Sequence, residues 1–393
     1  MTGTVHTQAG RQAAGAPLGS IGLRPFLDEF WQRQPCLIRQ AFPGFIPDLD
    51  ENDIAGLACE ELAQARLISG TFAARDWSLR YGPFQEDELR QLGPANWTLL
   101  VQDVEKHYPP LQSLLAQFRF LPSWRLDDLM VSVAAPGGSV GPHVDQYDVF
   151  LLQACGQRRW QISQNFSPAL LPDCELNVLQ NFTPEQEWLL HAGDMLYLPP
   201  GVAHHGIAVD LGMTWSIGLR APSQADLVQA FGEWLAEHQT EGERYTDPPV
   251  VHAGRAGEID RQVCQRMRKL AGQPFTSGPL FDQFLGEFLS RYRLAQQPAE
   301  PRRPVGLHAI DRALGTRSEL QLNPWTRLAW LDAGAGAVLF AAGSRFECGL
   351  ALAMSLCASP PTLPAAAECS PQDRKVLLDL VNQGHLLLPA EPD

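Results

Sequence analysis

Short apolar segments separated by glycine and proline turns fill the chain up to about residue 222 and constrain its fold more than any other feature. Five of these segments have the length of β-strands and are bounded by such turns. They cover residues 129–134, 148–154, 158–162, 195–198 and 213–219. Many short strands with this punctuation predict a β-sandwich or barrel, mixed here with short helices.

Helical periodicity replaces this pattern after Pro222. Ser223 is a candidate N-cap with Asp226 three residues later, and the apolar residues that follow recur at helical spacing. Residues 259–270 and 281–288 show the same spacing. Three helices are too few for an isolated bundle, so we expect either the β region or a second copy of the chain to cover their apolar stripes.

A linker rich in proline is predicted over residues 296–304, with a smaller module after it. Residues 338–348 are expected to form a short hairpin. The last helix should begin after Ser370, because Pro371 and Asp373 follow it in the order typical of a helix N-terminus.

Composition limits the classes of partner. The chain has 393 residues, 45% of them hydrophobic, which is enough for two or three domains. Its formal charge of −14 disfavours binding to nucleic acids and anionic membranes, and it favours a basic partner.

Three features bear on location. No apolar run approaches the ~20 residues that span a bilayer, so we expect no membrane association. Residues 1–20 lack the apolar core of a secretory signal and are expected to be flexible. The eight cysteines are scattered, and none forms a Cys-x-x-Cys pair, so we expect reduced thiols and a cytoplasmic protein.

His143 and Asp145 stand two positions apart at the start of a predicted strand. Because side chains in a strand alternate between its faces, they should share one face with Tyr147. Downstream, a Pro-Pro-Gly turn precedes the neighbours His204 and His205, and it would bring one of them back to the first pair. Adjacent strand residues face opposite ways, so only one of the two can join the site.

Two neutral imidazoles and one carboxylate on one side of a metal form the facial triad of non-haem Fe(II) oxygenases. The three positions left open are what a chelating 2-oxo acid and O₂ require. Structural zinc would need a closed, often thiolate-rich shell, and no cysteine is placed to provide it. A His-x-acid pair alone is a weak signal, since about one is expected by chance; the prediction depends on the strand and turn around it.

Arg158 and Arg159 begin the next strand, so one of them should face the interior. An inward guanidinium could hold the far carboxylate of a 2-oxo diacid with two hydrogen bonds. Alternatively, the two arginines flank a hairpin in solvent. Thr214 and Ser216 share a face of a later strand and could add a hydroxyl, or they simply fill the strand.

Around these residues the sequence resembles the JmjC-type cupin oxygenases, and among them the bacterial ribosomal oxygenases that hydroxylate an arginine of a large-subunit ribosomal protein. The resemblance covers roughly residues 20–222 and is looser beyond them. It lies in the segments FWQRQPCLIRQAFPGF, NWTLLVQDVEKHYPPL, WRLDDLMVSVAAPGGSVGPHVDQYDVFLLQACGQRRWQI, GDMLYLPPGVAHHG and WSIGLRAP.

The resemblance implies a mainly β fold with helices, in which a double-stranded β-helix (cupin/JmjC) domain over 21–222 carries catalysis. A helical dimerisation region over 223–298 and a winged-helix-like domain over 299–393 would follow. It also implies Fe(II), 2-oxoglutarate as cosubstrate, a homodimer, and a ribosomal protein of the large subunit as substrate.

Position by position, the resemblance places the iron ligands at His143, Asp145 and His204, since relatives can carry a different residue at the position of His205. It places the 2-oxoglutarate arginine at Arg158.

Substrate contacts map onto Asp128, Met130 and Tyr147. An acid can hold a guanidinium while Met and Tyr bracket its alkyl stem. Without the resemblance, Met130 is equally typical of a core, and Asp128 of a helix cap or a partner for Arg125.

We therefore expect an Fe(II)/2-oxoglutarate-dependent hydroxylase that acts on the β-carbon of an arginine. The same chemistry on a histidyl side chain or another protein is one alternative. Another is a non-catalytic metal-binding cupin that regulates transcription. Residues 301–393 hold eight lysines and arginines against nine acids, whereas DNA-binding modules are usually basic, so DNA binding is not expected. A purely structural dimer is the third alternative.

Overall fold

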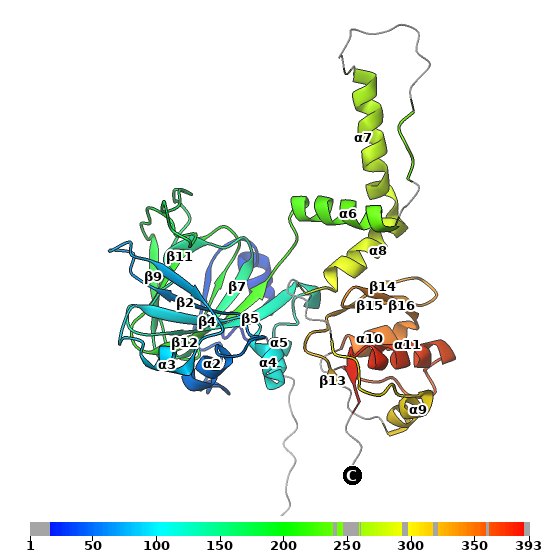
Figure 1. Cartoon of the computed structure of the whole chain (residues 1–393), viewed down its shortest axis with the longest axis horizontal. Coiled ribbons are helices and arrows are strands. Elements are labelled where there is room, and N and C mark those ends of the chain that lie inside the picture. The colour runs from blue at the N-terminus through cyan, green and yellow to red at the C-terminus, as the bar shows by residue number, and fades with distance from the viewer. Residues whose placement is uncertain are drawn as a thin grey trace, which may run out of the picture. The chain divides into compact units, whose positions relative to one another are not determined.

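The computed structural model describes residues 16–238, 242–246, 259, 261–292, 298–316, 321–358 and 361–388. The chain divides into two compact units between Ala221 and Pro222 (Figure 1). This division lies within one residue of the predicted end of the β region. Most of the expected flexible lead over residues 1–20 lies outside the described residues.

Two antiparallel sheets build the first unit. The larger sheet has the strand order β1-β10-β7-β12-β5-β4-β2-β3. Its strands are β1 (Cys36–Ile38), β2 (Ala65–Ser69), β3 (Ser78–Tyr81), β4 (Trp97–Val101), β5 (Leu126–Ala134), β7 (Asp148–Cys155), β10 (Met195–Leu198) and β12 (Gly212–Leu219). The smaller sheet has the order β6-β11-β8-β9 and contains β6 (His143–Val144), β8 (Arg158–Ser163), β9 (Gln186–Leu190) and β11 (Ala203–Ala208).

Each of the five predicted strands is present, as β5, β7, β8, β10 and β12. From β5 to β12 the chain passes back and forth between the two sheets, apart from the β8–β9 hairpin. This winding is that of a double-stranded β-helix, so the predicted barrel is confirmed.

Strand β7 shows why the interior can hold a site. Val149 and Leu151 pack toward the smaller sheet with Trp160, whereas Phe150 and Leu152 pack into the large core on the other face. Both faces are therefore buried, and the strand is a continuous apolar run. The helical segments of this unit are α1 (Leu23–Pro25), η1 (Phe26–Phe30), α2 (Glu51–Leu57), α3 (Glu86–Arg90), α4 (Val104–His107), η2 (Pro109–Leu111), α5 (Gln112–Ala116) and η3 (Ser123–Arg125).

Arg125 does not pair with Asp128, so this alternative for Asp128 is wrong. Arg125 Nη2 instead lies 2.7 Å from Asp148 Oδ2. The Tyr197 hydroxyl donates to Asp148 Oδ1 at 2.5 Å. Because all three groups are buried or nearly so, this hydrogen-bonded ion pair is a structural element of the large core.

The predicted continuous strand from His143 to Tyr147 is also wrong. Strand β6 ends at Val144, and Asp145 and Tyr147 lie in the connection to β7. The reason is topological, since β6 belongs to the smaller sheet and β7 to the larger one. The chain must turn between them at this point.

In the second unit three helices precede a small α/β module: α6 (Gln224–His238), α7 (Arg261–Thr276) and α8 (Gly278–Leu289). The Ser223 hydroxyl accepts a hydrogen bond from the Asp226 N–H at 3.1 Å, which confirms the predicted cap. Phe231 and Trp234 of α6 form a buried cluster with Phe284 of α8.

The module that follows contains α9 (Leu307–Thr316), β13 (Gln321–Leu322), β14 (Leu328–Asp332), β15 (Ala337–Ala341), β16 (Ser344–Cys348), α10 (Leu350–Leu356), α11 (Pro371–Asn382) and β17 (Leu386–Leu387). The predicted hairpin corresponds to β15 and β16. The predicted start of the last helix is confirmed, because Ser370 and Asp373 form a capping box. Of the predicted linker, only residues 298–304 are described, and they form neither helix nor strand.

All eight cysteines are free thiols. A search of the described helices finds none with the length and hydropathy that a membrane crossing requires.

Candidate metal and cosubstrate site

Three side chains converge inside the barrel. His143 of β6 is paired directly with His204 of β11, which places both imidazoles on one face of the smaller sheet. Asp145, in the turn after β6, faces them: its Oδ2 lies 3.6 Å from His204 Nε2 and 3.9 Å from His143 Nε2. These separations are too long for hydrogen bonds. All three ligand atoms lie within 4.8 Å of one another, an arrangement that could hold a metal ion.

The hydrogen bonds of the two imidazoles fix the tautomer that each would present to a metal ion. Nδ1 of His143 lies 2.9 Å from the Gly141 carbonyl, and Nδ1 of His204 lies 3.0 Å from the Val202 carbonyl. A carbonyl only accepts, so each Nδ1 carries the proton and each Nε2 presents its lone pair toward Asp145. Burial, with His143 nearby, lowers the pKa of His204 to about 4, which keeps this ring neutral. The donor set fits Fe(II).

His205 points away from this group. Its ring lies 5.8 Å from the Phe72 ring and 6.0 Å from the Phe182 ring, on the opposite face of β11. Strand alternation therefore brings His204, and not its neighbour, to His143.

Ile162 of β8 pairs with His204, and Arg158 lies four residues before Ile162 on the same strand. Because side chains alternate along a strand, Arg158 shares the interior face with His204. Its guanidinium is buried, and Nη2 donates to the Gly206 carbonyl at 3.2 Å, but Nε has no hydrogen-bond partner. Within the described ranges no carboxylate pairs with it. Burial lowers its pKa to about 10, so it stays charged at neutral pH.

A buried cation without a counter-charge is unfavourable unless an anion binds to it. The carboxylate of a 2-oxo diacid fits this requirement. Arg159 alternates to the other face of β8 and is half-exposed, with Nε 3.4 Å from Glu187 Oε1.

Two further residues shape the Arg158 site, and the sequence interpretation missed both. The guanidinium carbon of Arg158 lies 5.1 Å from the centre of the Trp160 ring, a cation–π contact. A Cβ at Gly206 would lie 2.7 Å from Arg158 Nε and 2.6 Å from the Trp160 ring. The missing side chain of Gly206 therefore makes room for the pair. Trp160 and Gly206 lie on the same face of their strands as Arg158 and His204. This alternation of side chains was the sequence signal that could have identified them.

The two candidate hydroxyls differ in their hydrogen bonding. Thr214 donates to the Gln153 side chain at 2.9 Å. Ser216, which pairs with Met130 and Leu151 on the interior face, makes no side-chain hydrogen bond to any described residue. Its hydroxyl is thus the more available of the two.

Asp128, Met130 and Tyr147 line the same interior. Met130 lies opposite Ser216, and a Cβ at Gly218 would lie 2.9 Å from Asp128 Oδ1. Met130 is half-buried, unlike the residues of the closed core. Tyr147 packs against the interior apolar cluster, with the Arg220 guanidinium carbon 4.5 Å above its ring.

Comparison with known proteins places this geometry in a family. One family model, described as a JmjC domain, matches residues 113–227, and another, described as a ROXA-like winged helix, matches residues 277–387. The predicted order of a JmjC cupin domain before a C-terminal winged helix is confirmed.

Relatives share much of this length. The ribosomal protein uL16 3-hydroxylase of Escherichia coli (strain K12) is 36% identical over 279 residues, which are 70% of this chain and 74% of that protein. The probable ribosomal oxygenase of Haemophilus influenzae is 37% identical over 265 residues, 65% of each chain. A solved structure of the E. coli ribosomal oxygenase YcfD with cobalt and 2-oxoglutarate superposes with a TM-score of 0.81 at 32% identity, covering 93% of this chain and 97% of that one. This chain therefore belongs to the family of JmjC-domain ribosomal oxygenases.

Proposed function

We propose that this protein is an Fe(II)- and 2-oxoglutarate-dependent hydroxylase that acts on the β-carbon of an arginine in a large-subunit ribosomal protein. One observation carries the proposal: three side chains that could hold a metal ion and an uncompensated buried arginine lie on the same interior face. The name of the E. coli relative, uL16 3-hydroxylase, supports the class of substrate.

The proposed roles follow from the donor groups. His143, Asp145 and His204 would hold Fe(II), which together with 2-oxoglutarate supplies the oxidation of an unactivated C–H bond by O₂. Arg158 would hold the far carboxylate of the cosubstrate, and Ser216 offers the more available hydroxyl of the two candidates. The apolar side chains of the barrel interior exclude water from the reacting groups.

Two neighbouring aspartates support an arginine substrate. Asp127 Oδ2 already lies 2.5 Å from Arg220 Nε. Asp128 forms no ion pair or side-chain hydrogen bond with any described residue, although its side chain is partly buried. A substrate guanidinium would supply the missing partner, while Met130 and Tyr147 flank its alkyl stem.

The test is turnover on peptides that cover the ribosomal protein uL16, with Fe(II), 2-oxoglutarate and O₂. We expect one arginine peptide to gain the mass of one oxygen atom, and tandem mass spectrometry to place it on the β-carbon. A peptide with lysine in place of that arginine is the control. Hydroxylation of a histidine instead would establish the alternative substrate, and the absence of 2-oxoglutarate turnover on every peptide would contradict the proposal.

Substrate binding should depend on pH through Asp128. Its pKa is raised to about 7, chiefly by burial and then by Asp127 and Asp103, against the opposing effects of Lys106 and Arg220. Below about pH 7 the carboxyl gains a proton and loses its attraction for a guanidinium. We expect kcat/KM for the peptide to fall from pH 8 to pH 6.

The Asp128→Asn variant is the control for this titration. It should lower kcat/KM roughly 10- to 100-fold at pH 8, because a charge-assisted hydrogen bond is lost, and it should flatten the profile. A profile in Asp128→Asn that falls as steeply as in the unchanged protein would assign the titration to another group.

We also propose that a second copy of the chain covers α7. Its apolar stripe of Val263, Met267 and Leu270 lies at helical spacing, yet none of the described residues of this helix is buried, and Met267 is 45% exposed. An amphipathic helix of this kind requires a partner surface.

Sedimentation analysis at micromolar concentration should therefore show a dimer, which Met267→Glu converts to a monomer. Gln265→Glu adds the same charge on the opposite face of α7 and should leave the dimer intact. A monomeric unchanged protein, or a Met267→Glu variant that remains dimeric, would contradict this assignment.

A cytoplasmic location and the absence of DNA binding belong to the same proposal. Free thiols suit a reducing compartment, and the ribosomal substrate class suits the cytoplasm. The net negative charge opposes binding to DNA, while it favours a basic ribosomal protein.

A further inference from the structure

Strand β5 is incompletely paired where it carries Asp128. Along one edge β4 pairs with it only from Val131 to Ala134, because β4 ends at Val101. Along the other edge the pairing with β12 shifts its register between Ile217 and Leu219. The segment of β5 around Asp128 therefore lacks regular ladder hydrogen bonds on both sides.

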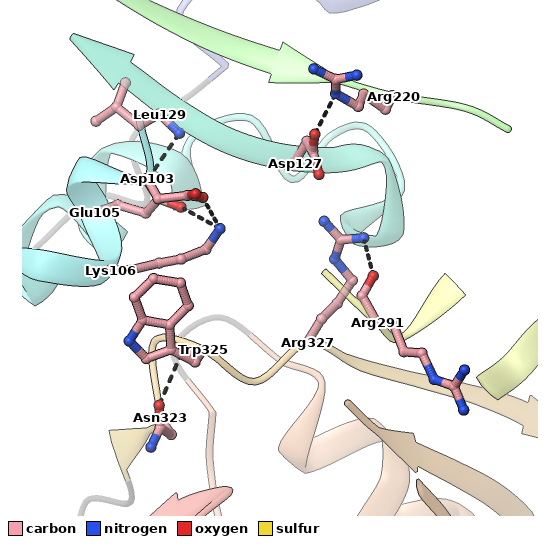
Figure 2. Close-up of polar contacts among 10 residues, drawn as sticks. All are labelled: Asp103, Glu105, Lys106, Asp127, Leu129, Arg220, Arg291, Asn323, Trp325 and Arg327. Atoms are coloured by element: carbon pink, nitrogen blue, oxygen red, sulfur yellow. Dashed lines mark hydrogen bonds and ion pairs between the residues drawn. The ribbon is translucent and has the colours of Figure 1, made fainter. Parts of the chain in front are cut away.

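Glu105 of α4 supplies a hydrogen bond at this place. Its Oε2 accepts from the Leu129 N–H at 3.0 Å (Figure 2). That N–H belongs to the peptide unit joining Asp128 to Leu129, so the bond acts directly on the backbone of Asp128. The acceptor thus takes the place of the strand that has ended.

The Glu105 carboxylate is itself firmly held. It is 1% exposed, and its Oε1 lies 3.6 Å from Lys106 Nζ, which also contacts Asp103 (Figure 2). Asp103 has a φ of 56°, and this left-handed residue turns the chain from β4 into α4. The end of β4 therefore determines the position of the Glu105 carboxyl group. A buried ionic cluster of this kind contributes little net stability to the fold, but it can fix the positions of its side chains.

We propose that Glu105 is a positioning residue for substrate recognition, which sets the backbone of Asp128 and Met130 through the Leu129 N–H. This inference rests on the proposed function, because it assigns a reason for holding Asp128 in place. The residues proposed for metal and cosubstrate binding lie on other strands of the barrel, so Glu105 is not expected to affect them.

Two conservative variants separate the hydrogen bond from the charge. Glu105→Asp keeps the charge but withdraws the acceptor by one methylene, whereas Glu105→Gln keeps an acceptor at the same reach without the charge. Glu61→Asp, at an exposed glutamate, is the matched control. Three quantities are measured: KM for the arginine peptide, the Kd of 2-oxoglutarate in the Mn(II) protein, and the hydrogen exchange rate of the Leu129 amide.

In Glu105→Asp we expect faster exchange at Leu129 and a peptide KM raised about tenfold, the effect of losing one buried hydrogen bond. The Kd of 2-oxoglutarate should stay within about twofold. Glu105→Gln and Glu61→Asp should resemble the unchanged protein in all three quantities.

The reverse pattern, in which Glu105→Gln raises KM and Glu105→Asp does not, would overturn the inference in favour of a role for charge. An unchanged KM in Glu105→Asp despite faster exchange would overturn it as well. If Glu105→Asp does not fold, the Gln variant decides, because a tenfold higher KM there contradicts positioning by the hydrogen bond. Failure of the unchanged protein to hydroxylate any arginine peptide would instead count against the proposed function.

Discussion

Replacing His204 by alanine is expected to abolish metal binding and to reduce turnover roughly 100-fold or more, since even the outer partners of metal ligands cost 10- to 100-fold. His143→Ala should do the same, because its Nε2 is directed at the same point as that of His204. Calorimetric titration with Mn(II) under anaerobic conditions measures the metal, and succinate release measures turnover.

The neighbouring histidine provides the matched control. His205→Leu removes an imidazole that is also buried but lies on the opposite face, where it packs near Phe72 and Phe182. We expect this variant to bind Mn(II) and to turn over 2-oxoglutarate nearly as the unchanged protein does. If His205→Leu lost the metal while His204→Ala kept it, the assignment of ligands would be wrong.

Replacing Arg158 by alanine is expected to weaken 2-oxoglutarate binding roughly 100-fold, because a buried carboxylate would lose its charged partner. Arg158→Lys should recover part of this affinity, since it keeps the charge but lacks the planar fork. Arg159→Ala, at the half-exposed neighbour, should bind normally. The Kd of 2-oxoglutarate in the Mn(II) protein is the measurement.

The same residue should have an opposite effect on the free protein. Without an anion, the Arg158 guanidinium is a buried charge with one hydrogen bond and no ion pair to the described residues. Arg158→Met should therefore raise the melting temperature in the absence of 2-oxoglutarate and remove the rise that 2-oxoglutarate causes in the unchanged protein. Equal melting shifts in both proteins would show that the cosubstrate binds elsewhere.

Local patterns were sufficient to predict the framework of the fold. Strands β7 and β12 are apolar runs between turns because both of their faces are buried. The beginnings of α6 and α11 were predictable because Ser223 and Ser370 satisfy backbone N–H groups that every helix start leaves open. The spacing of His143, Asp145 and His204 in the sequence likewise indicates a shared site, although their roles as metal ligands stay predictions.

Other features depend on contacts that the local sequence does not encode. Nothing in a stretch such as VEKHY distinguishes Glu105 from an exposed helical glutamate; only the place where β4 ends makes it a buried acceptor. Gly206 resembles an ordinary strand glycine until the Arg158 and Trp160 side chains are seen to fill its space. The early end of β6 follows from the exchange of sheets, which is a property of the whole barrel.

Strand β6 has two residues and lies at the edge of the smaller sheet, with His143 directly across from His204. A slip of one residue along β11 would turn His143 to the outer face. An ion held by both imidazoles is compatible with a single alignment of these strands. With Fe(II) bound by both imidazoles as proposed, metal binding would also fix the alignment of β6 against β11.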